Sequence, residues 1–216
     1  MRKKLLKIYD VLYETYGPQH WWPGDTPWEI CVGAVLTQNT NWGNVEKAIA
    51  NLKNSNDLLP EKIMAMPDSE LEDAIRPSGY FRIKTQRLKN VTRWWLDNVI
   101  SDRLSSSKGL AFWRRSILEV KGVGPETADS ILLYSFSLPT FVIDAYTRRI
   151  MARHCGTPED IDYHEIQGLF MENLPNDYKL FNEYHALFVM MAKNDCRKNS
   201  CSEKCPLCKL KKMSFK

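Results

Sequence analysis

The sequence has no long apolar run. No stretch of the 216 residues approaches the ~20 consecutive apolar side chains that a membrane-spanning helix needs. Residues 1–17 start with basic side chains but show apolar positions only at helical spacing, which predicts an amphipathic helix rather than a signal peptide. We therefore expect an intracellular protein of the cytoplasm, where disulfide bonds are rare.

The sequence also lacks the alternation of a β-strand and any internal repeat of solenoid length. Helix-start signals are frequent instead. Residues 26–29 (Thr-Pro-Trp-Glu) form a capping box with proline at the first helical position, and Asn41 and Asp68 are placed to cap two further helices. The pattern predicts an all-α fold with two helical lobes, residues 22–136 and residues 1–21 together with 137–216.

Later helices are expected near residues 81–99, 109–120, 126–137, 144–155, 161–173 and 178–193, and the one linker-like stretch is 101–109. The inner side of the first of these should carry Ile83, Leu88, Val91, Trp95 and Val99.

Charge is distributed unevenly along the chain. The net charge is +4, but residues 196–216 hold seven basic side chains and one acid, so this segment is +6 and the rest is −2. A basic tail on a near-neutral body indicates a polyanionic partner. The alternative is a tail that is merely solvated.

A turn with two glycines separates two predicted helices at Lys121-Gly122-Val123-Gly124. Both glycines are expected to take positive φ and to let the backbone approach a ligand closely. Pro125 suits the first turn of the next helix, whose free N–H groups and positive dipole end attract anions. Lys121 adds a positive charge. The turn therefore predicts a phosphodiester site; the alternative is a tight helix–helix turn without a ligand.

An acid follows twenty residues after Gly124, where the apolar pair Val142-Ile143 leads into Asp144. Asp144 can cap the helix that follows, or it can act as a carboxylate in a site. The two roles are compatible, because an acid at a helix start stays ionised.

Four of the six cysteines lie within thirteen residues and have the spacing C-x4-C-x3-C-x2-C: Cys196, Cys201, Cys205 and Cys208. In an intracellular protein this density indicates a metal site rather than disulfides. Zinc and a [4Fe–4S] cluster both accept four cysteines. Cys31 and Cys155 are isolated and expected to pack. The histidines, which share no spacing, receive no role: His20, His154, His164 and His185.

The string Leu-x-x-Lys-Gly-Val-Gly-x-x-Thr-Ala at 118–128, followed by Asp144, resembles the helix-hairpin-helix signature of the endonuclease III superfamily of DNA glycosylases. Together with residues 21–45 and with RPSGYFRIKTQRL at 76–88, it looks like the 3-methyladenine DNA glycosylase III branch, over roughly residues 20–190. The resemblance implies a monomeric enzyme of base excision repair, associated with the nucleoid, that binds double-stranded DNA carrying a damaged base.

The resemblance also implies roles for individual residues. Asp144 would be the catalytic carboxylate, opposing the positive charge of an oxocarbenium-like sugar. Residues 121–124 and Thr127 would bind the DNA backbone. Gln38 and Asn39 would fill the space left in the duplex by the extruded nucleotide, since amides can hydrogen-bond the orphaned base.

Four residues match the branch's base pocket: Trp21, Trp22, Pro23 and Trp42. Alkylated purines carry a positive charge, and indole faces attract cations. The remaining tryptophans are expected to pack in the core or at the surface: Trp28, Trp94, Trp95 and Trp113.

Glu126 stands where bifunctional members carry the lysine that attacks the sugar, and a carboxylate cannot form a Schiff base. The sequence thus predicts hydrolysis without efficient abasic-site lyase activity. The position of the four cysteines favours a [4Fe–4S] cluster over zinc, although their spacing departs from the superfamily's usual C-x6-C-x2-C-x5-C. Alternatives are a mismatch thymine/uracil glycosylase, a bifunctional glycosylase/lyase, and a non-catalytic DNA-binding module stapled by a metal.

Overall fold

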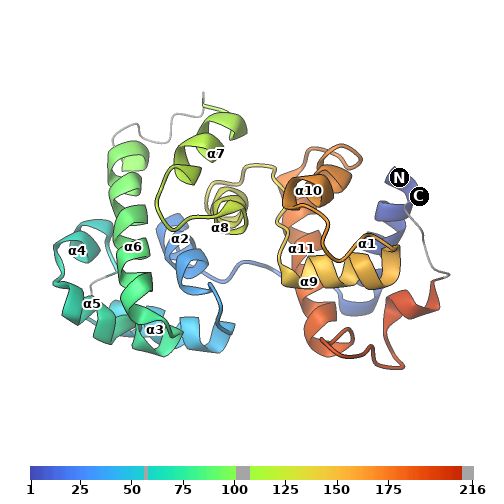
Figure 1. The fold of residues 1–216 in the computed structure, drawn as a ribbon, viewed down its shortest axis with the longest axis horizontal. Helices are drawn as coiled ribbons and strands as arrows, with labels where there is room; N and C mark the ends of the chain where they lie inside the picture. The colour runs from blue at the N-terminus through green and yellow to red at the C-terminus, as the bar shows by residue number, and fades with distance from the viewer. Residues whose placement is uncertain (56–57, 101–107, 211–216) are drawn as a thin grey trace. The chain divides into compact units, whose positions relative to one another are not determined.

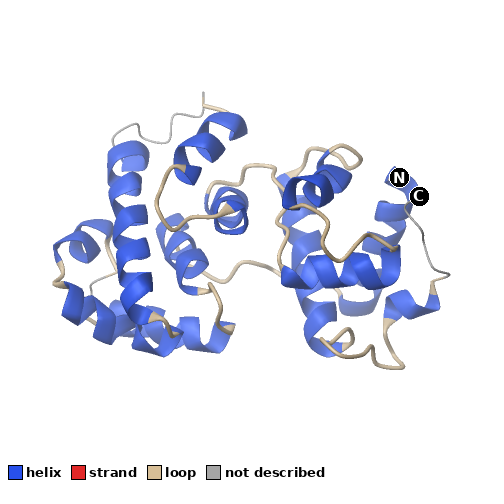
Figure 2. Ribbon diagram, viewed as in Figure 1, coloured by secondary structure: helices blue, strands red, loops and turns tan. Residues whose placement is uncertain are grey.

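The computed structural model describes residues 1–55, 58–100 and 108–210. Over these residues the chain is helical and forms no strand, apart from one isolated bridge between Cys196 and Cys201 (Figures 1 and 2). The all-α prediction is confirmed. None of the described helices combines the length and apolar character that crossing a membrane requires. Most of the predicted linker and the end of the basic tail lie outside the described residues.

The chain divides into two compact units. Unit 1 consists of Met1–Trp22 and Pro139–Lys216, and unit 2 is Pro23–Leu138. The predicted lobes were divided at residues 21/22 and 136/137. Both ends of the chain therefore belong to unit 1, and unit 2 is an insertion between its first helix and the rest.

Unit 2 contains α2 (Pro27–Leu36), α3 (Trp42–Asn54), α4 (Pro60–Ala65), α5 (Asp68–Ile75), a 3₁₀ turn (Arg76–Ser78), α6 (Phe81–Trp95), α7 (Leu110–Leu118) and α8 (Pro125–Ser130). Two of these helices continue into π-helical turns, α6 into Leu96–Ile100 and α8 into Ile131–Ser135.

Capping residues start the helices of unit 2 largely as predicted. The Thr26 side chain accepts a hydrogen bond from the Glu29 backbone N–H at 3.1 Å, and Asn41 accepts one from Asn44 N–H at 3.2 Å. Asp68 is different, because it is the first residue inside α5 rather than its cap. Its carboxylate instead accepts hydrogen bonds from Gln86 and Lys89 of α6, so the predicted cap acts as a link between two helices.

The core of unit 2 forms around α2, where every residue from Cys31 to Leu36 is buried. The four tryptophans assigned to packing are all buried here: Trp28, Trp94, Trp95 and Trp113. Along α6 the predicted inner side is right for Leu88, Val91, Trp95 and Val99. It is wrong for Ile83, which is 54% exposed, because the first turns of α6 bury the neighbouring Lys84 and Thr85 instead.

A buried lysine ties α2 to the start of α6. Lys84 is 1% exposed, and its Nζ donates to the carbonyl oxygens of Leu36, at 2.8 Å, and Ser78, at 2.6 Å. Burial lowers the pKa of Lys84 to about 8, with Arg87 adding to the effect. The Lys84 ammonium thus hydrogen-bonds the Leu36 carbonyl oxygen at the C-terminus of α2, where no following turn of helix supplies a backbone N–H.

Unit 1 contains α1 (Arg2–Tyr16), α9 (Ala145–Ile150) with a π-helical turn (Met151–Cys155), α10 (Tyr163–Met171), α11 (Tyr178–Asn194) and a 3₁₀ turn (Pro206–Lys209). Its core is aromatic. The rings of Phe141 and Phe170 stack at 3.9 Å, and the buried Tyr184 hydroxyl donates to Leu5 O at 2.8 Å, which joins α11 to α1. Cys155 packs in this core, and Cys31 packs in that of unit 2, as predicted.

Candidate functional site

The two glycines of the α7–α8 turn differ in conformation. Gly122 has φ +96°, and a Cβ there would lie 2.5 Å from Cγ of Arg87. Gly124 has φ −97°, so the prediction that both glycines take positive φ is wrong for Gly124. A Cβ at Gly124 would meet nothing within 4 Å. Gly122 is therefore required by the fold, whereas Gly124 leaves open space in front of the turn.

The two helices of the hairpin are held together by a buried ion pair. Arg114 of α7 donates through Nε and Nη2 to the two carboxylate oxygens of Asp129 in α8, at 2.9 and 3.1 Å. Asp129 is fully buried, and such a two-pronged pair fixes direction as well as distance. The turn is also tied to α6, where Asn90 donates to Lys121 O at 3.0 Å. Lys121 remains exposed.

Gln38, at the end of α2, contacts the hairpin within unit 2. Its Nε2 donates to Thr127 Oγ1 at 2.9 Å and to Gly122 O at 3.4 Å, and its Oε1 accepts from Arg87 Nη1. Asn39 is exposed and has φ +54°. Sequence reasoning missed Arg87, because an arginine in an amphipathic helix carries no signal of its distant partner. The amide of Gln38 is thus engaged in this structure, while Asn39 faces solvent.

Because their surroundings differ, the two glycines should respond differently to replacement by alanine. We expect Gly122→Ala to lower the free energy of unfolding by at least about 1 kcal/mol, because a Cβ strains positive φ and meets Arg87. Gly124→Ala should leave stability within about 0.5 kcal/mol, yet weaken DNA binding, because the methyl group enters the space through which a phosphate would approach. Denaturant unfolding and fluorescence anisotropy with duplex DNA measure the two effects. Equal DNA affinity of Gly124→Ala and wild type would contradict a backbone contact at this turn.

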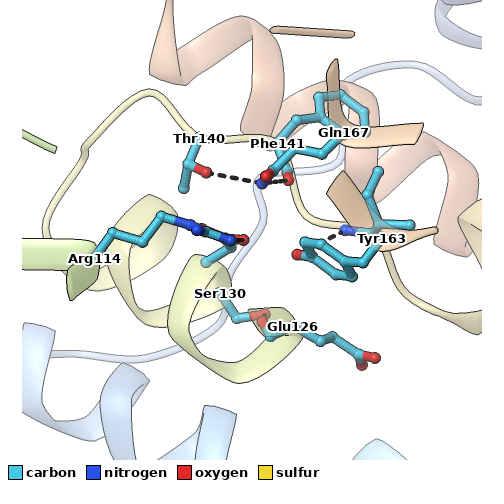
Figure 3. A network of polar contacts seen from close by, with 9 residues as sticks. Arg114, Glu126, Ser130, Thr140, Phe141, Tyr163 and Gln167 are labelled. Carbon is cyan, nitrogen blue, oxygen red and sulfur yellow. Dashed lines mark hydrogen bonds and ion pairs between the residues drawn. The ribbon is translucent and has the colours of Figure 1, made fainter. Parts of the chain in front are cut away.

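The segment that precedes Asp144 in unit 1 is extended and held by α10. Gln167 is buried, and its Nε2 donates to Phe141 O at 2.8 Å and to Thr140 Oγ1 at 3.2 Å (Figure 3). The Ile143 backbone N–H donates to the Tyr163 hydroxyl at 3.4 Å. These bonds satisfy backbone groups that no helix or sheet pairs, and they fix the direction in which the chain enters α9.

Asp144 is the N-cap of α9, as expected, and its Oδ1 accepts the Thr147 backbone N–H at 2.7 Å. Its Oδ2 lies 3.6 Å from His185 Nε2 of α11. Burial by itself would raise the pKa of Asp144, but His185 and the Thr147 donors outweigh it and hold the pKa below its ordinary value. The carboxylate, whose side chain is 15% exposed, is therefore ionised at neutral pH.

His185 was assigned no role from the sequence, and this is corrected by the structure. It is 4% exposed and lies among the buried residues of α11, within the run Tyr184–Val189. A buried imidazole against a carboxylate can orient it and carry part of its hydrogen bonding. The only hint in the sequence was a titratable residue in an apolar stretch, and such histidines often lack a functional partner.

The four predicted pocket residues belong to different units. In unit 1, the rings of Trp21 and Trp22 meet edge to face at 5.6 Å, and the Lys193 ammonium lies 5.8 Å from the Trp21 ring centre. In unit 2, Pro23 is exposed, and Trp42 is half-buried at the start of α3 with its Nε1 donating to Glu46 at 2.9 Å. The pocket that they would form together stays a prediction.

The four cysteines of the C-terminal loop lie close together, and His154 joins them from the turn after α9. His154 Nε2 is 3.5 Å from Cys196 Sγ, 3.4 Å from Cys201 Sγ and 3.8 Å from Cys205 Sγ. The donor atoms of His154, Cys201, Cys205 and Cys208 all lie within 4.8 Å of one another. The loop is thus a candidate metal centre, as predicted, with a histidine that sequence reasoning left out.

Two arginines donate hydrogen bonds to this loop. Arg153 donates through Nη1 to Cys196 Sγ at 3.2 Å and to Arg197 O at 2.8 Å, and Arg149 Nε donates to Cys196 O at 3.0 Å. Burial lowers the pKa of His154 to about 4, and the Arg153 charge adds to this. The imidazole is therefore neutral at pH 7, the form in which a ring nitrogen can bind a metal.

The donor chemistry of the loop is compatible with zinc and with an iron–sulfur cluster, since both accept four cysteines. Cys196 Sγ lies 3.5 Å from Cys201 Sγ, so it belongs to the same group of donor atoms. The identity of the metal stays a prediction.

Comparison with known proteins places these features in one family. The family model described as HhH-GPD superfamily base excision DNA repair protein matches residues 32–176, which include the hairpin and Asp144. A protein of Methanocaldococcus jannaschii, named as a candidate DNA repair glycosylase, is 45% identical over 206 residues, covering 94% of this chain and 93% of that protein.

Two solved structures share the fold. The Helicobacter pylori 3-methyladenine DNA glycosylase bound to 1,N6-ethenoadenine aligns with a TM-score of 0.71 and 28% identity, covering 88% of this chain and 94% of that one. A non-covalent endonuclease III–DNA complex aligns with a TM-score of 0.81 and 20% identity, covering 99% and 96%. The second likeness shows the fold alone. The resemblance inferred from the sequence is confirmed.

Proposed function

The chain belongs to the HhH-GPD superfamily of base excision DNA repair proteins, and from this membership we propose that it is a DNA glycosylase that hydrolyses the N-glycosidic bond of alkylated purines such as 3-methyladenine. Its partner is double-stranded DNA from which the damaged nucleotide has been extruded. The products are the free base and an intact strand with an abasic site.

The observation that carries the proposal is the state of Asp144. Departure of the base leaves positive charge on the sugar, and an ionised carboxylate stabilises that charge. Thr147 N–H and His185 hold the carboxylate in one orientation and keep its pKa low. The segment before Asp144 accepts a hydrogen bond from Gln167 and donates one to the Tyr163 hydroxyl, and these bonds hold it in place. A fixed charge needs no reorganisation when the sugar cation forms.

The hairpin of unit 2 supplies the proposed DNA contact. The open space in front of Gly124 and the exposed Lys121 suit a phosphate, which carries affinity but no sequence information. Gln38 and Asn39 are proposed to fill the space of the extruded nucleotide. Because the Gln38 amide bonds to Thr127 and Arg87 in this structure, it must exchange those partners to enter DNA, whereas Asn39 is exposed already.

The substrate class follows from the proposed pocket. Alkylation at a purine ring nitrogen creates a positive charge, which both weakens the glycosidic bond and attracts indole faces. Trp42 Nε1 donates a hydrogen bond to the Glu46 carboxylate, and this carboxylate adds negative charge beside the indole ring. The H. pylori relative is named as a 3-methyladenine DNA glycosylase and was solved with an ethenoadenine, and this supports an alkylated purine as the substrate.

Truncation of one indole tests the cation preference. Trp42→Ala should lose roughly 1–3 kcal/mol of recognition for a charged lesion such as 3-methyladenine and less for a neutral lesion. Trp42→Phe should keep part of the activity, since a smaller ring still stacks. Single-turnover base release with matched duplexes measures both. Equal losses for charged and neutral bases would remove the cation argument, and unchanged activity with lowered thermal stability would place Trp42 in the core alone.

Glu126 supports hydrolysis rather than lyase chemistry. It lies in the first turn of α8 and is exposed, and its carboxylate points away from the helix (Figure 3). A carboxylate at this position cannot form the covalent amine adduct that leads to strand cleavage. No reaction step requires the C-terminal metal. The [4Fe–4S] cluster predicted from the family resemblance stays a prediction, which iron and sulfide analysis tests.

The proposal is tested by incubating the full chain with a panel of otherwise identical duplexes that contain 3-methyladenine, 1,N6-ethenoadenine, a thymine or uracil mismatch, or no lesion. Chromatography of the supernatant identifies the released base, and Asp144→Asn serves as the control for contaminating enzymes. Release of 3-methyladenine is expected. Release of only thymine or uracil would assign the mismatch activity instead, and DNA binding without release of any base would support the non-catalytic alternative.

A further inference from the structure

Arg87 of α6 contacts both the end of α2 and the α7–α8 turn, all within unit 2. We propose that Arg87 binds a DNA backbone phosphate, and that this phosphate replaces the Gln38 amide as the acceptor of the guanidinium. The inference rests on the proposed function, because it names a further residue that would hold the DNA for the same reaction.

The aliphatic part of Arg87 passes along the turn, in the space that a side chain at position 122 would fill. A Cβ at Gly122 would lie 2.5 Å from Arg87 Cγ, 3.1 Å from Cδ and 3.3 Å from Nε. This packing brings the guanidinium to the hairpin and restricts its movement, so that less side-chain entropy is lost when the group binds a ligand. The glycine at position 122 is therefore what allows an arginine to reach this place.

The charge of Arg87 has no partner of opposite sign among the described residues. In this part of the chain its guanidinium donates only to the neutral Gln38 amide, through Nη1. Asp129, the buried acid of α8, is paired with Arg114, and Lys84, one turn earlier on α6, adds a charge of the same sign. A half-buried cation without a counter-ion is unfavourable, and this indicates an anionic ligand.

Most of the Arg87 donors are available to such a ligand. A guanidinium has five N–H donors in a fixed planar fork, and Gln38 accepts from one of the nitrogens. None of the Arg87 nitrogens is among the buried atoms that have no hydrogen-bond partner, so solvent reaches those that bond to nothing in the described part of the chain. Such a fork can donate two parallel hydrogen bonds to a phosphate. This contact is stronger and more directional than one bond to a neutral amide.

Exchange of the acceptor would release Gln38. In this structure Gln38 Oε1 accepts from Arg87, while its Nε2 donates to Thr127 Oγ1 at 2.9 Å and to Gly122 O at 3.4 Å. When a phosphate takes the place of Oε1 at Arg87, the Gln38 side chain keeps only the bonds of Nε2, and one of these is long. Binding of the DNA backbone at the hairpin would thereby loosen the amide that is proposed to fill the space of the extruded nucleotide.

The salt dependence of DNA binding tests the contact, measured by anisotropy with a duplex that carries a tetrahydrofuran abasic analogue. Arg87→Met keeps an apolar stem without the charge, and it should bind about fivefold to tenfold more weakly at 0.1 M salt. The slope of log K against log salt concentration should fall in magnitude by about 1. Arg87→Lys should keep the slope and lose part of the affinity, because an ammonium lacks the fork. Arg93→Met, which removes an exposed charge from the same helix, is the matched control and should keep the wild-type slope.

A second background separates a DNA contact from a purely positioning role. If Arg87 binds the phosphate itself, Arg87→Met should weaken DNA binding at least as much in Gln38→Ala as in wild type, because no exchange of partners is then needed. If Arg87 acts only by holding Gln38, the loss caused by Arg87→Met should disappear in that background, and this result would overturn the proposal. Thermal unfolding of each variant without DNA corrects the affinities for any unfolded protein.

These measurements do not depend on base release, so the two proposals can fail separately. DNA binding that requires Arg87, in a protein that releases no base from any duplex of the lesion panel, would reject the proposed reaction and leave the Arg87 contact standing. Base release by the wild type, together with unchanged DNA affinity and salt slope in Arg87→Met, would reject the contact and leave the reaction standing.

Discussion

Asp144→Asn should bind a lesion duplex with wild-type affinity and release the base at least about 100-fold more slowly. Asparagine is as good an N-cap as aspartate, so the bond to the Thr147 N–H is kept and α9 still starts correctly. What is lost is the charge that opposes the sugar cation. The comparison of this variant with wild type therefore isolates electrostatics from folding.

Single-turnover kinetics and anisotropy measure the two quantities on the same duplex. Asp144→Ala is a useful second variant, because it removes both the charge and the cap and should also lower the free energy of unfolding by ~1 kcal/mol. Near-normal base release by Asp144→Asn would exclude Asp144 from the mechanism. Loss of DNA binding together with loss of release would point to a structural role instead.

The low pKa of Asp144 determines the pH range over which its carboxylate stays charged. Because its folded-state pKa lies below the ordinary value, the carboxylate stays charged to lower pH than that of an unperturbed aspartate. The part of base release that depends on Asp144 should therefore persist to lower pH than an ordinary aspartate would allow. For the same reason, its contribution to the free energy of unfolding is present above the unfolded pKa and is lost as the pH falls through the folded pKa. Rates of wild type and Asp144→Asn, subtracted at each pH, test this.

Borohydride should trap almost no covalent complex between the wild-type protein and lesion DNA, and Glu126→Lys should create one. The reason is chemical: reduction traps a Schiff base, which requires an amine, and position 126 offers a carboxylate. The wild type should also leave the strand uncut beyond the background of heat or alkali. Denaturing gels with labelled duplex detect both the trapped complex and the nick.

The new lysine should react slowly, because an exposed side chain in the first turn of α8 is not desolvated, and burial is the strongest way in which a protein lowers a lysine pKa to favour the free amine. Glu126→Gln is the matched control, since it removes the charge without adding an amine and should trap nothing. Efficient trapping by the unmodified protein would mean that another amine, such as that of the exposed Lys121, reaches the sugar. The hydrolytic assignment would then fail, although the glycosylase assignment would stand.

Local patterns in the sequence were sufficient for much of the fold and part of the candidate site. Helical periodicity, the capping residues Thr26 and Asn41, and the turn before Pro125 depend on neighbours within four residues, so they can be found without tertiary structure. The same holds for the N-cap role of Asp144 and for the density of cysteines in the C-terminal loop. Each of these features depends on backbone hydrogen bonds between near neighbours or on residues that are close together in the sequence.

Tertiary structure decided which side chains act together. His185 meets Asp144 from 41 residues away, and His154 meets Cys201 from 47 residues away. Arg87 donates to the Gln38 side chain and fills the space beside Gly122. Position 122 therefore requires glycine, whereas position 124, which looks the same in the sequence, does not. Such pairings depend on how α9, α11 and the C-terminal loop pack in unit 1, and α2, α6 and the hairpin in unit 2. Packing is set by the whole apolar pattern of a unit, and no short motif contains it.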